Sequence, residues 1–409
     1  MPDRKTSSPR ILRIITRLNI GGPSLHAILL SLHLDPERFS TCLVVGKPDP
    51  IEGDLSQRLC GHSVKMVRLS SLRRPIHPFA DLLSLLRIWH IVLRERPQVI
   101  HTHMAKAGTL GRLAGALYNW SGHWRSSGAR AILIHTFHGH VLDGYFPRWL
   151  SWMLLCIEQR LAKSTDCLIA VNPVIRDQLL HKGIGRPDQW RVIPLGLDLS
   201  AFSQLPFSNG SSLIRCGLIG RLVPIKNPGL FLQALHRLLV RDARREDLCG
   251  VIVGDGPLRP ILERETERLG LEQVVRFTGW QQDVASVYRE LEIACLTSEN
   301  EGTPVSLIEA MAAGRAIVGT DVGGVRDLLG GMEAPRSIPR GGCSIAPRGI
   351  LIRPGDADGL AVALETLASD ANLRAALGKA ARAYALEAFS QHRLLRDVGA
   401  LYERLRVEG

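Results

Sequence analysis

Short apolar runs alternate with longer amphipathic segments along most of the chain. In the first half, the longer segments carry apolar residues at helical spacing, as residues 78–94 do. The strands predicted in this half cover residues 11–16, 41–46, 99–103, 131–137, 167–171 and 190–194. The clearest predicted helices cover residues 24–34 and 78–94. This alternation is typical of a doubly wound, mostly parallel sheet.

A second alternating series follows a polar segment at 203–212, SQLPFSNGSS, which is the best linker candidate. Its predicted strands cover residues 213–220, 248–254, 274–279, 293–298 and 316–320, and its predicted helices include 228–242 and 257–269. A last helical pattern runs over 373–406 with a break near Phe389–Ser390. The pattern predicts two Rossmann-like α/β domains, and a cleft between such domains is the expected ligand site.

Length and composition exclude several classes of protein. The 409 residues are too many for one ordinary core, and 45% hydrophobic with 22% charged residues is a globular composition. No apolar run approaches the roughly 18 residues of a membrane span, and the first residues lack a secretion signal. The eight cysteines are scattered without zinc spacing, which favours reduced core thiols. We expect a cytoplasmic protein.

The net positive charge of the chain lies entirely in its first half. Residues 1–205 contain 26 Lys and Arg against 14 Asp and Glu, whereas residues 206–409 contain 25 of each. A one-sided basic domain indicates an anionic partner such as nucleic acid, phospholipid headgroups or a phosphorylated substrate, and a merely solvated basic face is the alternative. Only 5% aromatic residues and the lack of a recognised motif argue against nucleic acid.

The segment SENEGTPVSLIEAMAAG at 298–314 contains the strongest candidate chemistry. A helix is predicted to begin near Thr303–Pro304, so the backbone amides of its first turn attract phosphate. The residues that supply this end of the helix are Thr303, Pro304, Val305 and Ser306. Glu301 precedes the helix and Glu309 lies on it, and carboxylates beside a phosphate site suit sugar hydroxyls. The alternative is that these acidic residues only complement the helix dipole, which would explain Glu301 but not Glu309.

A second segment, GLIGRLVPIKNPG at 217–229, places Arg221 and Lys226 between a strand and a helix. Two cations at such a junction can bind a diphosphate. The dinucleotide pattern GxGxxG is missing after the first strand, where the sequence reads NIGGPSLH, and VGDGPLR at 253–259 has only GxG. A nicotinamide enzyme is therefore disfavoured.

In combination these motifs resemble the retaining glycosyltransferases of family 4, which have the two-domain GT-B fold. EGTPVSLIE resembles that family's Glu-x7-Glu motif, and GRLVPIK its diphosphate-binding Arg and Lys. VGDGPLR, FTGW and GTDVGGVRDLL follow in the family's order, and IGGPSLH, HTHMAKAGTLGRLAG and TFHGH resemble its amino-terminal elements. The resemblance implies an acceptor-binding domain over 1–205, a nucleotide-sugar domain over 206–385, and a helix over 386–409 that packs back on the first domain.

The resemblance also implies a role for each site residue. Arg221 and Lys226 would hold the donor diphosphate, Glu309 the ribose, and Glu301 the transferred sugar. The remaining donor-site positions would be Gly21, Gly22, Thr303, Pro304, Val305 and Ser306, with His138 lining the sugar site as a catalytic residue beside Glu301. Hexose transfer would retain the anomeric configuration and need neither a metal nor another cofactor.

Three tempting features are discounted. Asp356 and Asp358 form a DxD, but they immediately precede a helical pattern and are better explained as helix capping. No closed ligand set is evident among the histidines at predicted strand ends, His101, His103, His135, His138 and His140, so zinc is disfavoured. Trp149 and Trp152 are assigned to the core or to an interface.

The chain departs from the family pattern in two places. Thr303–Pro304 replaces the more common Phe-Gly, which bears on the donor sugar. Residues 330–348 look longer than the usual connection and are interpreted as a flexible surface insertion without an assigned role.

The basic half is the acceptor domain in GT-B enzymes, so we expect an anionic acceptor or surface. His103, Lys106 and Arg112 are the acceptor-side candidates, and arginines cluster around the amphipathic stretch 78–94. The hypothesis is a polyprenyl-diphosphate-linked acceptor for cell-surface polysaccharide, used at the anionic inner face of the cytoplasmic membrane. The alternatives are a soluble acceptor, or a non-catalytic nucleotide-binding protein. Family frequency favours a UDP-sugar donor.

Overall fold

The structure is a computed structural model that describes residues 8–48, 53–122, 130–139, 147–207, 213–241, 247–333 and 337–408. The chain divides into two compact domains: the first comprises residues 1–197 and 391–409, and the second comprises residues 198–390. The second begins ahead of the predicted linker, whose residues 208–212 lie outside the described part.

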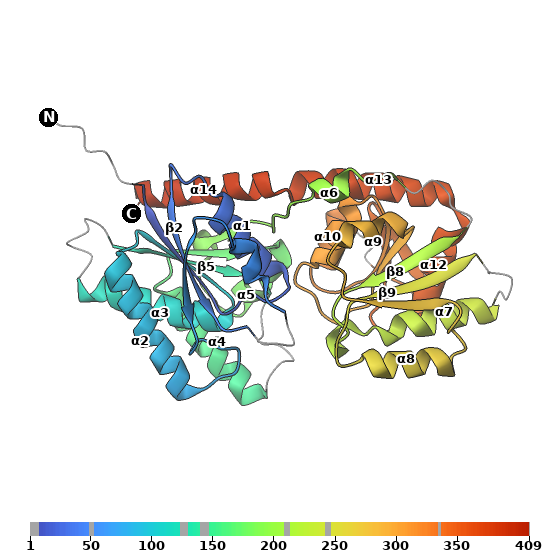
Figure 1. Ribbon diagram of the computed structural model, residues 1–409, viewed down its shortest axis with the longest axis horizontal. Helices are drawn as coiled ribbons and strands as arrows, with labels where there is room; N and C mark the ends of the chain where they lie inside the picture. The colour runs from blue at the N-terminus through green and yellow to red at the C-terminus, as the bar shows by residue number, and fades with distance from the viewer. Residues whose placement is uncertain are drawn as a thin grey trace. The chain divides into compact units, whose positions relative to one another are not determined.

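The first domain is a parallel sheet of seven strands in the order β3-β2-β1-β4-β5-β6-β7 (Figure 1). Its strands are β1 Arg10–Ile15, β2 Ser40–Gly46, β3 Lys65–Leu69, β4 Val99–His103, β5 Ile132–Phe137, β6 Cys167–Ala170 and β7 Trp190–Val192. Its helices are α1 Gly22–His33, α2 Pro78–Glu95, α3 Ala105–Ser121, α4 Arg148–Ala162, α5 Pro173–His181 and α14 Gln391–Glu408. The edge strand β3 was not predicted.

The carboxy-terminal helix α14 belongs to the core of this first domain. Its residues Leu394, Val398 and Tyr402 are fully buried. They form one hydrophobic cluster with Leu30 of α1 and Ile134 of β5. The break after α13 falls at Phe389–Ser390, as predicted, because α13 ends at Ala388 and α14 begins at Gln391. The fold therefore returns its last helix to the domain that contains the first strand (Figure 1).

Helix α3 packs on the sheet through a face made of glycines. A Cβ atom at Gly108, Gly111 or Gly115 would lie 2.4 to 2.6 Å from side-chain atoms of β4 and β5 residues. The stretch KAGTLGRLAG thus encodes close helix–sheet packing, since only glycine leaves this space free. On this face of the sheet, α3 packs beside α2 (Figure 1).

The second domain is a seven-stranded sheet in the order β10-β9-β8-β11-β12-β14-β13, parallel except for β13. Its strands are β8 Ile214–Ile219, β9 Leu248–Val253, β10 Val275–Gly279, β11 Ile293–Leu296, β12 Ala316–Thr320, β13 Cys343–Ala346 and β14 Gly349–Ile352. Its helices are α6 Ser200–Ser203, α7 Gly229–Arg241, α8 Arg259–Arg268, α9 Val284–Glu290, α10 Val305–Ala312, α11 Val325–Leu329, α12 Ala357–Ser369 and α13 Ala371–Ala388.

The predicted insertion over 330–348 needs a correction. Its last part forms β13, which pairs antiparallel with β14 at the edge of the sheet. Residues 343–346 are therefore part of the sheet and not a flexible surface loop; the residues 334–336 lie outside the described part. The sequence contained no strong sign of this strand because Cys343–Ala346 is only partly buried, as edge strands often are.

All eight cysteines are free, and four of them are buried as core thiols. Within the described ranges, no helix combines the length and the apolar character required to cross a bilayer.

Candidate active site

The predicted donor residues of the second domain meet where the strand order reverses. β8 and β11 are neighbours in the sheet, but the chain continues from β8 to β9 on one side and from β11 to β12 on the other. In open α/β sheets, ligands bind at the carboxyl ends of the strands at such a point. The loop after β8 contains Arg221 and Lys226, and the loop after β11 contains Glu301 and Thr303.

Hydrogen bonds join these two loops into one unit. The Thr297 hydroxyl donates to the Lys226 carbonyl at 2.8 Å, and the Glu299 amide donates to the Ile225 carbonyl at 2.9 Å. The Asn227 side chain, on a residue in the left-handed region at φ 43°, donates to the Glu299 carboxylate at 2.6 Å. Loops tied in this way hold their side chains in place before a ligand arrives, which is what electrostatic stabilisation requires.

Lys226 and Glu301 form an ion pair across the two loops. The same Glu301 oxygen accepts a hydrogen bond from Ser298 at 2.6 Å. The Glu301 side chain is only 10% exposed, while that of Lys226 is 26% exposed. The cation predicted to bind the donor diphosphate and the carboxylate predicted to bind the sugar therefore lie in direct contact.

A third loop supports the backbone of Glu301 through a glycine. Gly323 has φ 47°, and a Cβ atom there would lie 1.8 Å from the Glu301 carbonyl oxygen. The next amide, of Gly324, donates to the Gly302 carbonyl at 3.0 Å. Any side chain at Gly323 would displace the Glu301 loop, which explains the first glycine of the pair in TDVGGVRDLL.

Helix α10 presents its amino-terminal end at this junction. Pro304 is its N-cap residue and makes no side-chain cap hydrogen bond. The first-turn amides, which include those of Val305 and Ser306, and the helix dipole together suit a phosphate group. Thr303, Val305 and Ser306 are all partly exposed, so this end of the helix is accessible.

A tyrosine that the sequence did not reveal lies beside Glu309 and holds the backbone of the same helix, α10. The buried Tyr288 hydroxyl lies 2.7 Å from the Ser306 carbonyl and 3.5 Å from a Glu309 carboxylate oxygen. Burial, and then the charge of Glu309, raise the pKa of Tyr288 well above its usual value, so the hydroxyl remains a donor. Tyr288 occupies an apolar position of a short helix, and nothing in that pattern identifies its polar partner.

The Arg221 loop is anchored to the VGDGPLR segment. The Leu222 amide donates to the Asp255 carbonyl at 2.9 Å, and the Leu258 amide donates to the Leu222 carbonyl at 3.1 Å. Arg221 itself is partly exposed beside this anchor. The motif therefore has a structural use: it fixes the backbone that carries the predicted diphosphate-binding arginine.

In the first domain, the predicted residues gather at the reversal between β1 and β4. Gly21 is the N-cap residue of α1 and Gly22 is its first residue, His103 ends β4, and His138 follows β5. The His103 and His138 rings are joined by a 3.2 Å contact between Nδ1 and Nε2. His26 of α1, which was not assigned a role, completes the group with its ring 5.0 Å from His138 and 5.5 Å from His103.

These histidines are electrically neutral. Burial lowers the pKa of His138 to about 3. Burial, reinforced by neighbouring rings, also lowers the pKa values of His26 and His103 far below 6.5. Among the described residues, no cluster of three His, Cys, Asp or Glu is arranged to hold a metal ion; His140 lies outside them. The sugar-site role of His138 remains a prediction.

We expect the first domain to lose stability as the pH falls below about 6.5. An unfolded histidine titrates near that pH, while the buried histidines stay neutral, so the unfolded state binds more protons and acid favours it. Each such histidine can contribute about 1.4 kcal/mol per pH unit. Urea unfolding at pH 7.5, 6.5 and 5.5 measures this slope. His103→Asn should reduce it, and the exposed His62→Asn should not; a midpoint independent of pH would contradict the neutral cluster.

Two of the acceptor-side candidates form ion pairs with other residues of the first domain. Lys106 pairs with Asp81 of α2 at 2.6 Å and is only 13% exposed. The Arg112 prediction needs a correction, because its guanidinium is fully buried and pairs with Glu158 of α4 at 2.6 Å. Arg112 therefore links α3 to α4 and is not available to an acceptor.

Capping explains the first carboxylate of the DxD, Asp356, as predicted, but the second, Asp358, forms ion pairs and does not cap the helix. The Asp356 carboxylate accepts the Gly359 amide at 2.9 Å as the N-cap of α12. Asp358 pairs with Arg237 and Arg241 on α7. Neither carboxylate belongs to the junction that contains Glu301.

Comparison with known proteins agrees with this geometry. A family model described as "Glycosyl transferases group 1" matches residues 214–370, and one described as "Glycosyl transferase 4-like domain" matches residues 21–196. The chain therefore belongs to the group 1 glycosyltransferases of the family 4 type, and it is a glycosyltransferase.

Two of the similar curated proteins are glycosyltransferases with different acceptors in their names. The UDP-Gal:alpha-D-GlcNAc-diphosphoundecaprenol alpha-1,3-galactosyltransferase of Escherichia coli is 26% identical over 303 residues, which cover 71% of this chain and 74% of that protein. The D-inositol 3-phosphate glycosyltransferase of Saccharomonospora viridis is 26% identical over 380 residues, which cover 87% and 77%.

The solved structures confirm the GT-B fold. Anabaena Alr3699/HepE in complex with UDP superposes with a TM-score of 0.76 at 19% identity and covers 97% of this chain and 100% of that one. Sucrose-phosphate synthase from Thermosynechococcus elongatus has a TM-score of 0.74 at 20% identity, covering 98% and 100%.

Proposed function

We propose that this glycosyltransferase moves a hexose from a UDP-sugar to a lipid-linked acceptor, with retention of configuration and without a metal or cofactor. The junction of Lys226, Glu301 and the start of α10 at the β8–β11 reversal carries the proposal. It combines a cation, helix amides and a carboxylate, which suit a diphosphate joined to a sugar. UDP in the name of a similar protein and in a structure of similar fold supports this donor.

The proposed step breaks the bond between the anomeric carbon and the donor phosphate oxygen. The electron pair leaves with the diphosphate, whose growing charge Arg221, Lys226 and the α10 amides would stabilise. The acceptor hydroxyl oxygen forms the new bond on the same face of the sugar, and its proton passes to the departing phosphate oxygen. Glu301 would bind the sugar and Glu309 the ribose hydroxyls.

A polyprenyl-diphosphate-linked sugar is the acceptor we favour, in the synthesis of a cell-surface polysaccharide at an anionic membrane. The excess of basic residues in the first half suits such a substrate and surface, and the Escherichia coli relative is named for a diphosphoundecaprenol acceptor. A soluble phosphorylated acceptor is the second candidate, because the Saccharomonospora viridis relative is named for D-inositol 3-phosphate.

A thermal-shift panel of UDP, GDP and UDP-sugars tests the donor site. UDP at 100 times its dissociation constant should stabilise the wild type by about 2.7 kcal/mol. Glu309→Ala should lose most of this shift, while Glu365→Ala, an exposed glutamate on α12, should keep it. No shift with any of these nucleotides would overturn the donor assignment.

Transfer of a labelled sugar from the donor, measured with the same protein preparation, tests the acceptor. N-acetylglucosaminyl-diphosphoundecaprenol and D-inositol 3-phosphate are supplied separately, and products are divided by organic extraction. Label in the organic phase alone supports the lipid-linked acceptor, whereas label transferred only to the inositol phosphate replaces it with the second candidate.

A further inference from the structure

Helix α2 is apolar on both its inner and its outer side. Its inner residues Ile88 and Val92 are buried in the core cluster of the sheet and α3. Its outer residues, spaced as i, i+3, i+4 and i+7, are Phe79, Leu82, Leu83 and Leu86, and they are 81%, 55%, 43% and 50% exposed. A helix that faced only water would carry polar residues on that side.

The two neighbouring helices repeat this pattern. The outer side of α3 exposes Leu113, Leu117 and Trp120, the last to 86%. The outer side of α4 exposes Trp149, Trp152 and Met153, and both tryptophans are 68% exposed, so they are not core residues. We call these outer residues of α2, α3 and α4 together the apolar face.

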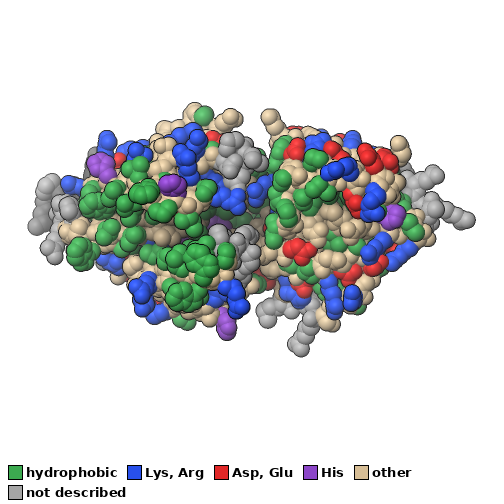
Figure 2. Space-filling model, turned by 90° about the horizontal axis from the view of Figure 1, so that it is seen from below, with side chains coloured by type: hydrophobic (Ala, Val, Ile, Leu, Met, Phe, Trp, Pro, Cys, Tyr) green, Lys and Arg blue, Asp and Glu red, His purple; other side chains and the backbone are tan. Residues whose placement is uncertain are grey.

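The helices that form the apolar face are adjacent. α3 packs against both α2 and α4, and buried or half-buried ion pairs join them: Lys106 with Asp81, and Arg112 with Glu158. On the first domain, at the left of Figure 2, hydrophobic side chains gather with basic side chains around them. Exposed apolar patches of this extent mark an interaction surface.

The exposed charged side chains of these helices are all positive. Each carboxylate of α2, α3 and α4 is paired with a cation: Asp81 with Lys106, Glu95 with Lys65, and Glu158 with Arg112. Four arginines on α2 and α4 are exposed: Arg87, Arg94, Arg148 and Arg160. A partner that covers the apolar face must therefore accommodate apolar side chains that have positively charged arginines beside them.

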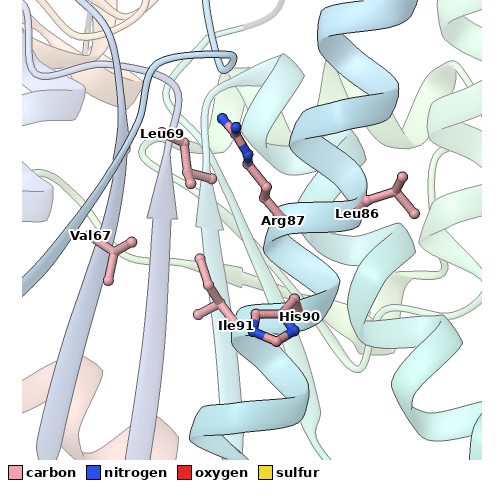
Figure 3. Close-up of a pocket in the computed structure, with 6 residues that line it drawn as sticks. All are labelled: Val67, Leu69, Leu86, Arg87, His90 and Ile91. Carbon is pink, nitrogen blue, oxygen red and sulfur yellow. The ribbon is translucent and has the colours of Figure 1, made fainter.

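A groove lies beside the α2 part of this face, between α2 and the edge strand β3 (Figure 3). It has a volume of about 320 Å³ and is lined by Val67, Leu69, Leu86, Arg87, His90 and Ile91. Leu86 belongs both to the apolar face and to the groove, so the two are continuous. An arginine next to a mainly aliphatic groove suits a molecule with an anionic head and a hydrocarbon chain.

We propose that the apolar face inserts into the headgroup–acyl boundary of an anionic lipid bilayer. Tryptophan and leucine side chains partition into that boundary, and arginines beside them are attracted to anionic headgroups. This inference deepens the membrane part of the proposed function by naming the contacting side chains and by adding hydrophobic insertion to charge attraction.

The charge pattern favours a bilayer over a second copy of the chain. In a symmetric dimer the same patch of both copies forms the interface, so the exposed arginines of one copy would meet those of the other. The carboxylates of these helices are already paired and could not neutralise them. An anionic bilayer supplies the opposite charge over the whole face.

Flotation of the full chain with vesicles tests the proposal. The wild type should bind vesicles of phosphatidylcholine with 30% phosphatidylglycerol at low salt, and bind pure phosphatidylcholine vesicles more weakly. Trp149→Ser with Trp152→Ser should weaken binding roughly tenfold or more through lost insertion. Arg87→Ser and Arg148→Ser should each weaken it about fivefold and only on anionic vesicles.

The matched control removes exposed apolar side chains from the second domain. Val240→Ser with Ile261→Ser, at 70% and 53% exposure, should bind vesicles like the wild type. The proposal would be overturned by any of three results: loss of binding in this control, wild-type binding by the tryptophan variant, or no binding by the wild type. It would also be overturned by a dimer, seen by sedimentation, that the tryptophan variant converts to a monomer. The UDP thermal shift is measured on the same samples, and it separates failure of the membrane face from failure of the donor site.

Discussion

Arg221→Ala and Lys226→Ala should each lower kcat/KM for sugar transfer about 100- to 1,000-fold. Each removes a cation from the proposed diphosphate site, where charge would develop on the leaving group, and losses of this size are typical for such groups. The Lys226 change also leaves Glu301 without its ion-pair partner, so a carboxylate would then repel the donor. We therefore expect UDP affinity to fall with kcat/KM for this variant.

Steady-state kinetics with the wild type as reference measure the effect, and circular dichroism checks that the variants fold. Arg237→Ala is the matched control, because Arg237 is a surface arginine of the same domain that pairs with Asp358. It should keep kcat/KM within about twofold. Wild-type activity in either Arg221→Ala or Lys226→Ala would remove that residue from the proposed site.

Arg112→Met should destabilise the first domain by about 3–5 kcal/mol. The change leaves the Glu158 carboxylate buried without its cation, and breaking a buried pair from one side has this cost. Urea unfolding followed by circular dichroism measures the loss.

The double variant Arg112→Met with Glu158→Leu should recover most of that stability, because it removes the unpaired charge as well. Arg176→Met breaks the exposed pair with Asp177 and should cost less than about 1 kcal/mol. Equal losses for the single and double variants would mean that the packing of the Arg112 side chain matters and the charge does not.

Motif spacing was sufficient to predict that the candidate donor residues of the second domain lie at one edge of its sheet. Strand–loop–helix order placed Arg221, Lys226 and Glu301 in loops after strands and Glu309 on the helix that follows, and in a parallel sheet the carboxyl ends of strands lie on one edge. Their supports could not be found in the same way. Tyr288 is 21 positions from Glu309 and Thr297 is 71 positions from Lys226, and hydrogen bonds between distant positions leave no local pattern.

The acceptor side was predicted less well, for an identifiable reason. Arg112 was selected by charge and by its neighbours in KAGTLGR, but charge alone does not tell a solvent-facing arginine from one paired in a helix interface. Trp149 and Trp152 were assigned to a core or an interface because they are apolar. Their exposure depends on which side of α4 meets the rest of the domain.

The sequence by itself determined the α/β alternation, the break near Phe389, the capping role of Asp356 and the donor motifs, because these depend on neighbouring residues and on helix or strand periodicity. The tertiary structure decided the Lys226–Glu301 contact, the neutral histidine group, the burial of Arg112 and the exposure of the apolar face. A helix with apolar residues on two sides has no unique buried side in its sequence. Packing against β4, β5 and the neighbouring helices covers one side of α2 and α3 and leaves the other exposed.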